Sequence, residues 1–239
     1  MGVYDRNDSR RIVDVSAVSS LATRVYSWMS VGLLCTAFVA LAVVRAGIHT
    51  KLLPYLFLMG LATLGIALTI NAMVNKLSFP GMAGLFLLYS GIQGLFFGAV
   101  LPIYAAHFGG EVIWTTFLTA GTLFGVAVLY GIFTKADLTR LTKILQLALF
   151  GLIALTLVYA IASLFLPITG GMLIISYFGL ILFVGLTAFD AQAIRRVSQE
   201  VHGDSIAARK LSLMLALKMY INVIMIFWYL LQILSSNRR

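Results

Sequence analysis

Seven apolar runs of about 20 residues constrain this chain more than any other feature, because an α-helix of that length crosses the hydrocarbon core of a bilayer. Charged residues and turn formers separate consecutive runs. The composition agrees, since 61% of the residues are hydrophobic and only 10% are charged, against about half and about a quarter in soluble domains. The sequence therefore predicts an all-α, polytopic membrane protein. Its seven transmembrane helices are expected near residues 25–44, 55–74, 82–106, 112–133, 144–166, 172–189 and 213–234.

The parts of the chain outside these runs are short. Residues 1–24 mix Asp with Arg and contain no apolar stretch, so they do not fit a cleavable signal peptide and are expected to form a cytoplasmic N-terminal tail. Residues 25–234 then make up a seven-helix transmembrane domain, and residues 235–239 form a short C-terminal tail. The loops between the runs leave no room for a second domain.

The distribution of Lys and Arg predicts the orientation, because short loops rich in positive charge stay in the cytoplasm. The N-terminal tail and the second, fourth and sixth loops hold 12 of these residues: Arg6, Arg10, Arg11, Arg24, Lys76, Lys135, Arg140, Lys143, Arg195, Arg196, Arg209 and Lys210. The opposite side holds 4: Arg45, Lys51, Arg238 and Arg239. We therefore expect a multi-pass protein of the cell inner (cytoplasmic) membrane with its N-terminus in the cytoplasm.

The charge and the ligand-type residues exclude several kinds of partner. A formal net charge of +9 in such an apolar chain indicates topology and contact with anionic lipid, so the expected partner is the lipid bilayer and not a nucleic acid. The single cysteine, Cys35, lies inside the first apolar run. The three histidines fall in three different loops, so neither a metal site nor a cofactor is expected. These histidines are His49, His107 and His202.

Known intramembrane active sites do not match this sequence. No His-Glu-x-x-His motif occurs, the Gly203-Asp204 pair lies in a loop, and Ser90 has no His in a later span that would act as its base. A retinal protein would use Lys218 in the last span, but the first five spans contain no Asp or Glu to serve as counter-ion. We therefore expect that the protein is not an enzyme.

Very few polar residues lie within the spans, and such residues are costly and usually functional. Asp190 is expected at the cytoplasmic end of the sixth span, and Lys218 about one and a half turns into the seventh. Asn222 follows one turn later on the same helical face, and Lys218 is expected either to extend toward the cytoplasmic surface or to pair with Asp190. Neutral polar residues in the second, third and fifth spans are expected to form interhelical hydrogen bonds. They are Asn71, Gln93 and Gln146.

Two pairs of glycines predict close helix packing. Gly94 and Gly98 lie one turn apart in the third span, and Gly121 and Gly125 lie one turn apart in the fourth. Small residues at this spacing allow the backbones of neighbouring helices to approach each other.

Four segments of the chain carry a resemblance to a known family. The first, residues 183–192 (FVGLTAFDAQ), looks like the signature of the Bax inhibitor, or transmembrane Bax-inhibitor-motif, family. Three further segments agree: VYSWMSVGLL at 25–34, LYG at 129–131 followed by TKADL at 134–138, and ALKMYIN at 216–222. The resemblance covers nearly the whole chain and is closest to the bacterial branch.

The resemblance implies a bundle in which six helices surround a central last helix. It also implies a pH-sensitive calcium leak gated by two aspartates that share a hydrogen bond between the sixth and seventh spans. The first aspartate corresponds to Asp190, but the second falls on Asn222. The resemblance also implies an arginine near the end of the second span, which holds the acidic pair in conducting bacterial members. This chain has no arginine there, only Asn71 and Asn75.

These departures leave two functions open. The first is a passive leak channel for Ca²⁺ with weakened or altered pH gating, in which Asp190, Asn222 and Lys218 form the gate and Asn71 and Gln93 add polar lining. The second is a non-conducting membrane regulator that binds another membrane protein, such as a protease or a stress-response partner. Without a second carboxylate the repulsion between like charges is absent, so the proton switch is expected to weaken.

Overall fold

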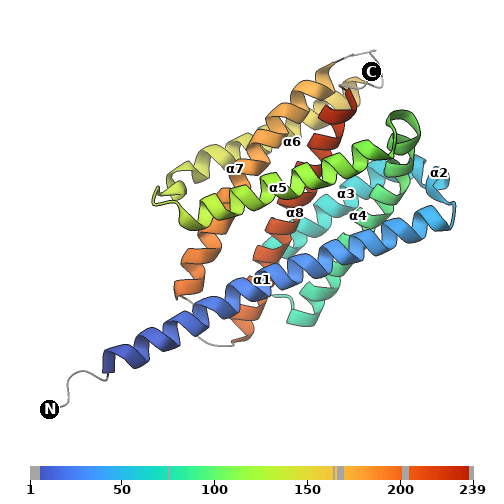
Figure 1. The fold of residues 1–239 in the computed structure, drawn as a ribbon. Coiled ribbons are helices and arrows are strands. Elements are labelled where there is room, and N and C mark those ends of the chain that lie inside the picture. The colour runs from blue at the N-terminus through green and yellow to red at the C-terminus, as the bar shows by residue number, and fades with distance from the viewer. Residues whose placement is uncertain (1–5, 75, 164, 166–169, 201–204, 237–239) are drawn as a thin grey trace. The chain divides into compact units, whose positions relative to one another are not determined.

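The computed structural model describes residues 6–74, 76–163, 165, 170–200 and 205–236. Within these ranges every regular element is helical and no strand occurs, which confirms the all-α prediction (Figure 1). In chain order the elements are α1 Arg6–Arg45, α2 His49–Leu52, the 3₁₀ turn η1 Leu53–Tyr55, α3 Leu56–Ala72, α4 Phe79–Phe108, α5 Gly110–Phe133, the 3₁₀ turn η2 Leu138–Leu141, α6 Thr142–Ala162, α7 Gly171–Glu200 and α8 Ile206–Ser236.

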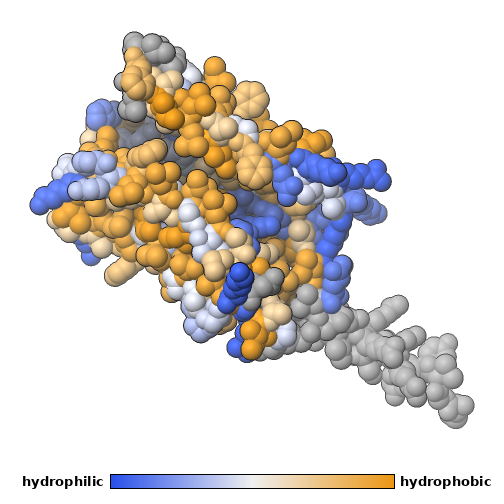
Figure 2. Space-filling model, turned by 180° about the vertical axis from the view of Figure 1, so that it is seen from behind, coloured by the Kyte–Doolittle hydropathy of each residue, from blue (hydrophilic) through white to orange (hydrophobic). Residues whose placement is uncertain are grey.

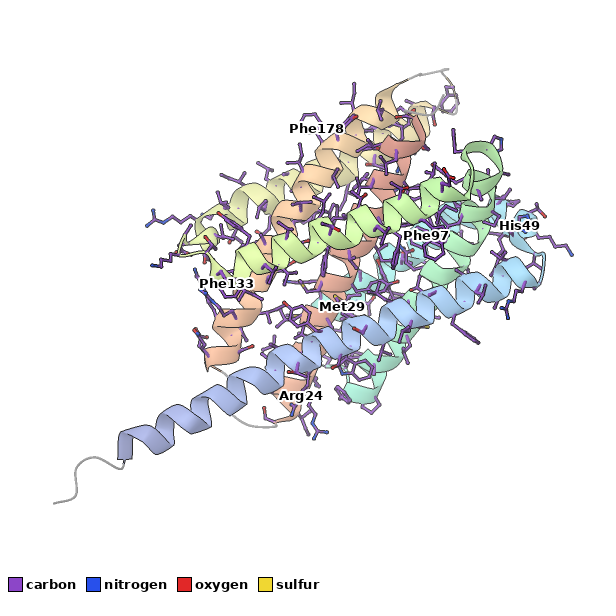
Figure 3. The ribbon with its side chains drawn as sticks, in the orientation of Figure 1. Arg24, Met29, His49, Phe97, Phe133 and Phe178 are labelled. Carbon is purple, nitrogen blue, oxygen red and sulfur yellow. The ribbon has the colours of Figure 1, made fainter. Side chains whose placement is uncertain are left out.

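In the part of the chain that the structure describes, seven helical segments are long and apolar enough to cross a membrane, which confirms the number of spans expected from the sequence. They are Leu21–Arg45, His49–Ala72, Phe79–Phe108, Gly110–Phe133, Leu138–Ala162, Gly171–Glu200 and Ile206–Ser236. Apolar side chains dominate the face seen in Figure 2. Phe133 on α5 and Phe178 on α7 project outward, as Figure 3 shows, so large rings face the surroundings as lipid contact requires.

The ends of the helices differ from the sequence expectation. The segment 190–212 was expected to be a loop, but α7 continues to Glu200 and α8 begins at Ile206. Along the end of α7, buried Ala191, Ile194 and Ser198 recur at helical spacing among polar residues. An amphipathic turn lowers the hydropathy without ending the helix, so the apolar run stops before the helix does. Ser205 caps the start of α8, because its Oγ accepts a hydrogen bond from the Ala208 N–H at 3.1 Å.

The turn between α4 and α5 consists of a single residue. Gly109 has a φ of 83°, which glycine adopts without the steric cost that a side chain imposes. His107 lies in the last turn of α4, and His49 begins α2, so neither lies in the loop that the sequence indicated. His202 lies outside the described residues.

The chain forms two compact units. Unit 1 comprises Met1–Ile103 and Ala193–Tyr220, and unit 2 comprises Tyr104–Gln192 and Ile221–Arg239. Helices α4, α7 and α8 therefore contribute residues to both units. Of the seven spans, α8 is the most buried, with 56% of its most apolar window buried against 44% or less for the others. The central position that the family resemblance implies for this helix stays a prediction.

Unit 1 is organised by close contact between α1 and α4. A Cβ added at Gly94 would lie 2.6 Å from the Cβ of Val39, and one at Gly98 would lie 2.7 Å from the Cβ of Val43. Real Cβ atoms do not approach that closely, so these two glycines allow α1 to pack directly on α4. The prediction from the glycine spacing is confirmed for this pair.

Unit 2 is built around residues of α5, α6, α7 and α8. Its core cluster consists of Ala120, Leu152, Ile175, Leu182, Phe183, Ile226, Tyr229 and Leu230. The close packing predicted at Gly121 and Gly125 is wrong, because a Cβ at either residue would meet no described atom within 4 Å. Close approach in α5 occurs instead at Gly131, which lies against the carbonyl oxygen of Ala188.

Candidate functional site

A buried polar pair joins α7 to α8 inside unit 2. The Nδ2 of Asn222 donates a hydrogen bond to Oδ2 of Asp190 over 2.7 Å. Only 6% of Asp190 and 4% of Asn222 is exposed. The carboxylate was expected at the end of a helix, but it lies within α7, ten residues before Glu200. Asp190 is therefore a packed interhelical group and not a charge at a helix end.

The chemistry of this pair depends on the ionised carboxylate. An amide N–H donates well to a negatively charged oxygen, and such charge-assisted hydrogen bonds are short and strong. Burial opposes the charge, because one amide replaces only part of the hydration that a carboxylate has in water. The pair is thus stable while intact and costly to separate, unless water or a cation reaches the carboxylate.

Two further contacts fix the position of this carboxylate along α7. Before it, the Ala188 carbonyl lies so close to Gly131 of α5 that no Cβ fits between them. After it, the side chain of Gln192 forms two hydrogen bonds with the backbone of the segment that follows α5. Its Nε2 donates to the Ala136 carbonyl at 2.7 Å, and its Oε1 accepts from the Leu138 N–H at 3.0 Å.

The role of Gln192 was missed in the sequence, although it lies in the segment FVGLTAFDAQ. Its side chain is 2% exposed, and both ends of its amide are bonded to backbone of the 136–138 segment. The available signal was an amide side chain between small residues on a helix. That signal identifies a buried polar group but does not identify its partner, which lies more than 50 residues earlier in the chain.

The other expected site residues lie in unit 1. Lys218 is half-buried on α8, four residues before Asn222 and more than three turns after Ile206, so it lies deeper in its helix than the expected one and a half turns. Gln93 is half-buried on α4. Asn71 is exposed on α3, and its Nδ2 donates to the Ala67 carbonyl of the same helix at 2.8 Å. The interhelical role predicted for Asn71 is therefore wrong. Gln146 is likewise exposed, on α6.

A second polar cluster, within unit 1, was not anticipated from the sequence. The Tyr220 hydroxyl on α8 shares a hydrogen bond with Thr36 of α1, and Thr36 also donates to the Ser90 carbonyl of α4 at 3.0 Å. The Tyr220 ring meets the rings of Phe86 and Tyr89 edge to face, with centroids 5.8 and 5.6 Å away. Tyr220 is fully buried, so this cluster connects three helices of unit 1 through neutral groups alone.

Comparison with known proteins shows that the chain is similar to a family of membrane proteins. The family described as inhibitor of apoptosis-promoting Bax1 matches residues 18–239. An uncharacterized protein of Chlamydia muridarum is 47% identical over 239 residues, covering 99% of this chain and 98% of its own. The inner membrane protein YbhL of Escherichia coli K12 is 35% identical over 244 residues, covering 100% of both chains. An uncharacterized protein of Borreliella burgdorferi is 32% identical over 220 residues, covering 90% of this chain and 91% of its own.

Proposed function

The chain belongs to the family of inhibitors of apoptosis-promoting Bax1, and from that premise we propose that it is a passive, Ca²⁺-permeable leak channel whose closed state is held by the Asp190–Asn222 hydrogen bond. We place it in the inner membrane, where the name of the relative YbhL places that protein, and orient its N-terminus toward the cytoplasm. The role needs no cofactor and no catalytic residue.

The observation that carries this proposal is a buried carboxylate bonded across two membrane helices. Ionisable groups at such depth are expensive and usually belong to an ion pathway or a relay. Carboxylate oxygens are also preferred ligands of Ca²⁺. When the Asn222 amide separates from Asp190, the exposed carboxylate attracts a cation, and when the bond reforms it removes that site. Few charges lie along the spans, which favours a leak over a pump.

The gate we propose differs in its pH response from a gate made of two carboxylates. Two neighbouring carboxylates repel each other when both ionise, and the pair responds to protons as one unit. Asn222 does not ionise, so the amide bond to Asp190 persists without that repulsion. Calcium flux is therefore expected to vary little between about pH 6 and about pH 8, a range well above the pKa of an ordinary aspartate.

Calcium uptake into proteoliposomes loaded with a fluorescent indicator tests the proposal directly. The purified chain should admit Ca²⁺, and Asn222→Ala should raise the basal rate by about tenfold, as expected when a hydrogen bond to a charged group is lost. Ser176→Ala is the matched control, because it removes another buried hydrogen bond of unit 2, from Ser176 Oγ to Gln232 Oε1 at 3.0 Å. Equal flux in protein-free vesicles and in proteoliposomes would exclude the leak.

The proposed orientation is tested separately by cysteine labelling. In a Cys35→Ser background, single cysteines at Ser205 and at Ser236 lie at opposite ends of α8. A reagent that does not cross membranes should label position 236 from outside intact cells and leave position 205 unlabelled. The reverse pattern would invert the topology.

A non-conducting regulator is the second candidate, and the asparagine at position 222 favours it. A chain that lacks one of the two gating carboxylates that the family resemblance implies is a candidate for a role that does not depend on flux. In that case proteoliposomes would admit no Ca²⁺, while the tagged full-length chain would retain a membrane protease or stress-response protein through solubilisation.

A further inference from the structure

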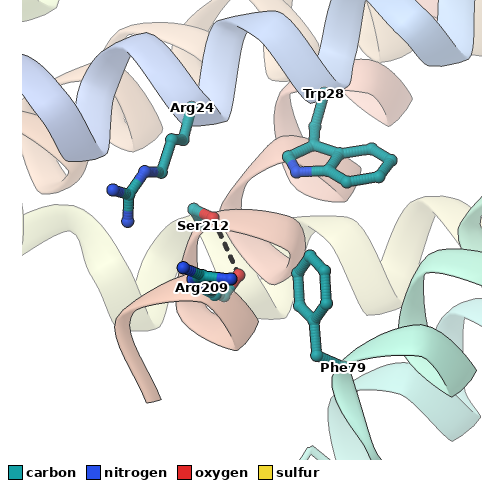
Figure 4. A pocket seen from close by; sticks show the side chains of 5 residues that line it. All are labelled: Arg24, Trp28, Phe79, Arg209 and Ser212. Carbon is teal, nitrogen blue, oxygen red and sulfur yellow. Dashed lines mark hydrogen bonds between the residues drawn. The ribbon is translucent and has the colours of Figure 1, made fainter. Parts of the chain in front are cut away.

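A pocket of about 250 Å³ opens in unit 1 near the starts of three apolar spans. It is lined by Arg24 and Trp28 of α1, Phe79 of α4, and Arg209 and Ser212 of α8 (Figure 4). These residues lie near the starts of the first, third and seventh spans. A chain that crosses a membrane at every span begins its odd-numbered spans on the same side, so the pocket lies at one membrane boundary.

The polar side of the pocket has the chemistry of a phosphate site. In Figure 4 the guanidinium of Arg24 extends from α1 toward Arg209 on α8. Two guanidinium groups from separate helices match the planar, multidentate geometry by which arginine binds phosphate oxygens. Ser212 also lines the pocket, and its buried Oγ donates a hydrogen bond to the Arg209 carbonyl at 2.7 Å within the first turns of α8.

The surrounding charge also favours an anion. The sequence of unit 1 contains 12 basic residues against five acidic ones, Asp5, Asp8, Asp14, Glu200 and Asp204. The basic residues are Arg6, Arg10, Arg11, Arg24, Arg45, Lys51, Lys76, Arg195, Arg196, Arg209, Lys210 and Lys218. This imbalance makes the potential around unit 1 positive and attracts anionic headgroups to it.

The apolar side of the pocket continues into the membrane. Trp28 and Phe79 meet edge to face, with centroids 6.0 Å apart and planes at 72°, at the depth where aromatic residues border the headgroups. A second pocket, of about 180 Å³, shares Arg24 and Trp28 and continues along α1 past Ser27 to Val31. Residues 24, 28 and 31 lie on one face of a helix, so the second pocket runs from Arg24 along α1 beside apolar side chains.

We propose that these two adjoining pockets bind one anionic phospholipid. Its phosphate lies between Arg24 and Arg209, and one acyl chain follows α1 past Trp28 and Val31. A soluble phosphate would use only the first pocket, whereas a phospholipid accounts for both. The site is independent of Ca²⁺ flux, so it stands or falls separately from the proposed channel.

Trp28 is a reporter at the centre of the proposed site. In a Trp114→Phe, Trp228→Phe background it is the only tryptophan, since the chain has three. The full-length chain is reconstituted in phosphatidylcholine vesicles that contain a minor fraction of phosphatidylglycerol brominated on its acyl chains. Bromine quenches nearby indole fluorescence, and the reference vesicles contain the same fraction of brominated phosphatidylcholine instead.

We expect half-maximal quenching at an about tenfold lower fraction of brominated phosphatidylglycerol than of brominated phosphatidylcholine. Arg24→Gln with Arg209→Gln should remove this preference. Arg45→Gln with Lys51→Gln removes the same charge from unit 1 outside the pocket and should preserve it. Unfolding curves of all variants verify that each is folded. As a second measurement on the chain with all three tryptophans, phosphatidylglycerol retained after detergent washing should fall in the Arg24, Arg209 variant alone.

Three results would overturn the lipid site. Equal quenching by both brominated lipids shows no preference for an anion. A preference that both double variants keep, or lose to the same extent, shows general attraction to a basic surface. Relief of the phosphatidylglycerol quenching by soluble glycerol 3-phosphate or inorganic phosphate at matched ionic strength shows a site for free phosphate rather than for a lipid.

Discussion

The polar cluster of unit 1 contains Tyr220 and the polar pair of unit 2 contains Asn222, only two residues later on α8. The polar atoms of the two groups are nevertheless satisfied in different ways. Around Tyr220, hydroxyl groups bond to each other and to a helix carbonyl, and aromatic rings enclose them. At Asn222, one amide meets a single carboxylate. A neutral network is satisfied without ionisation and serves as structure. A buried carboxylate retains a strong demand for water or cations, which suits a group that must switch.

The largest expected effect is on the stability of unit 1. Tyr220→Ala should lower the free energy of unfolding by about 4 kcal/mol, because it leaves a cavity among Phe86, Tyr89 and Thr36 and removes the hydroxyl. Tyr220→Phe keeps the ring and should cost only about 1 kcal/mol. Unfolding of the detergent-solubilised chain measures both. Equal stability of the alanine variant and the wild type would show that this cluster is not a structural core.

The next effect tests how tightly the carboxylate of unit 2 is positioned. Gly131→Ala should destabilise the chain by about 2 kcal/mol, because the new Cβ overlaps the Ala188 carbonyl that lies two residues before Asp190. Gly121→Ala on the same helix is the matched control. Its Cβ would meet open space, so it should be neutral or slightly stabilising through better helix propensity. Equal unfolding midpoints for the two variants would contradict the close packing of α5 on α7.

These glycines also show how far the sequence predicts the structure. Identical spacing in the third and fourth spans predicted close packing in both, but only Gly94 and Gly98 meet a neighbour. Spacing defines which residues share a helical face, and it does not tell whether that face meets protein or lipid. Gly131, without a glycine partner one turn away, makes the closest approach among the glycines of α5.

For the candidate site, the sequence likewise identified polar residues better than it identified their partners. The number of spans follows from length and hydropathy alone, because a bilayer imposes both. The pairing of positions 190 and 222 was anticipated through a family resemblance, whereas neither Gln192 nor Thr36 had a visible partner in the sequence. Their partners lie 54 to 184 residues away in the chain, and only the packed helices bring them together.

A third prediction separates structure from function directly. Asp190→Asn keeps the shape of the side chain, removes its charge and allows an amide pair with Asn222, so the free energy of unfolding should change by about 1 kcal/mol or less. Calcium flux should nevertheless fall by about tenfold, since the cation loses its carboxylate. Thr36→Val in unit 1 should show the opposite pattern, with reduced stability and unchanged flux. If Asp190→Asn leaves both flux and stability unchanged, Asp190 has no role in conduction.

The smallest expected effect, and the most specific, concerns the missing second carboxylate. Asn222→Asp places two carboxylates where the wild type has one hydrogen-bonded pair, so like charges repel and a shared proton becomes part of the closed state. Flux of this variant should change severalfold between about pH 6 and about pH 8, while the wild type stays nearly level across that range.

Lys218, four residues earlier on α8, adds a positive charge on the same helical face and favours both anions. Asn222→Asp combined with Lys218→Met should therefore titrate more clearly than Asn222→Asp alone, and Lys218→Met by itself should remain level. The cluster around Tyr220 would then respond to changes of shape, and the Asp190–Asn222 pair to changes of charge. Steep titration of the wild-type flux would mean that another group senses protons. The Asp190–Asn222 pair would then not explain the pH response of the channel.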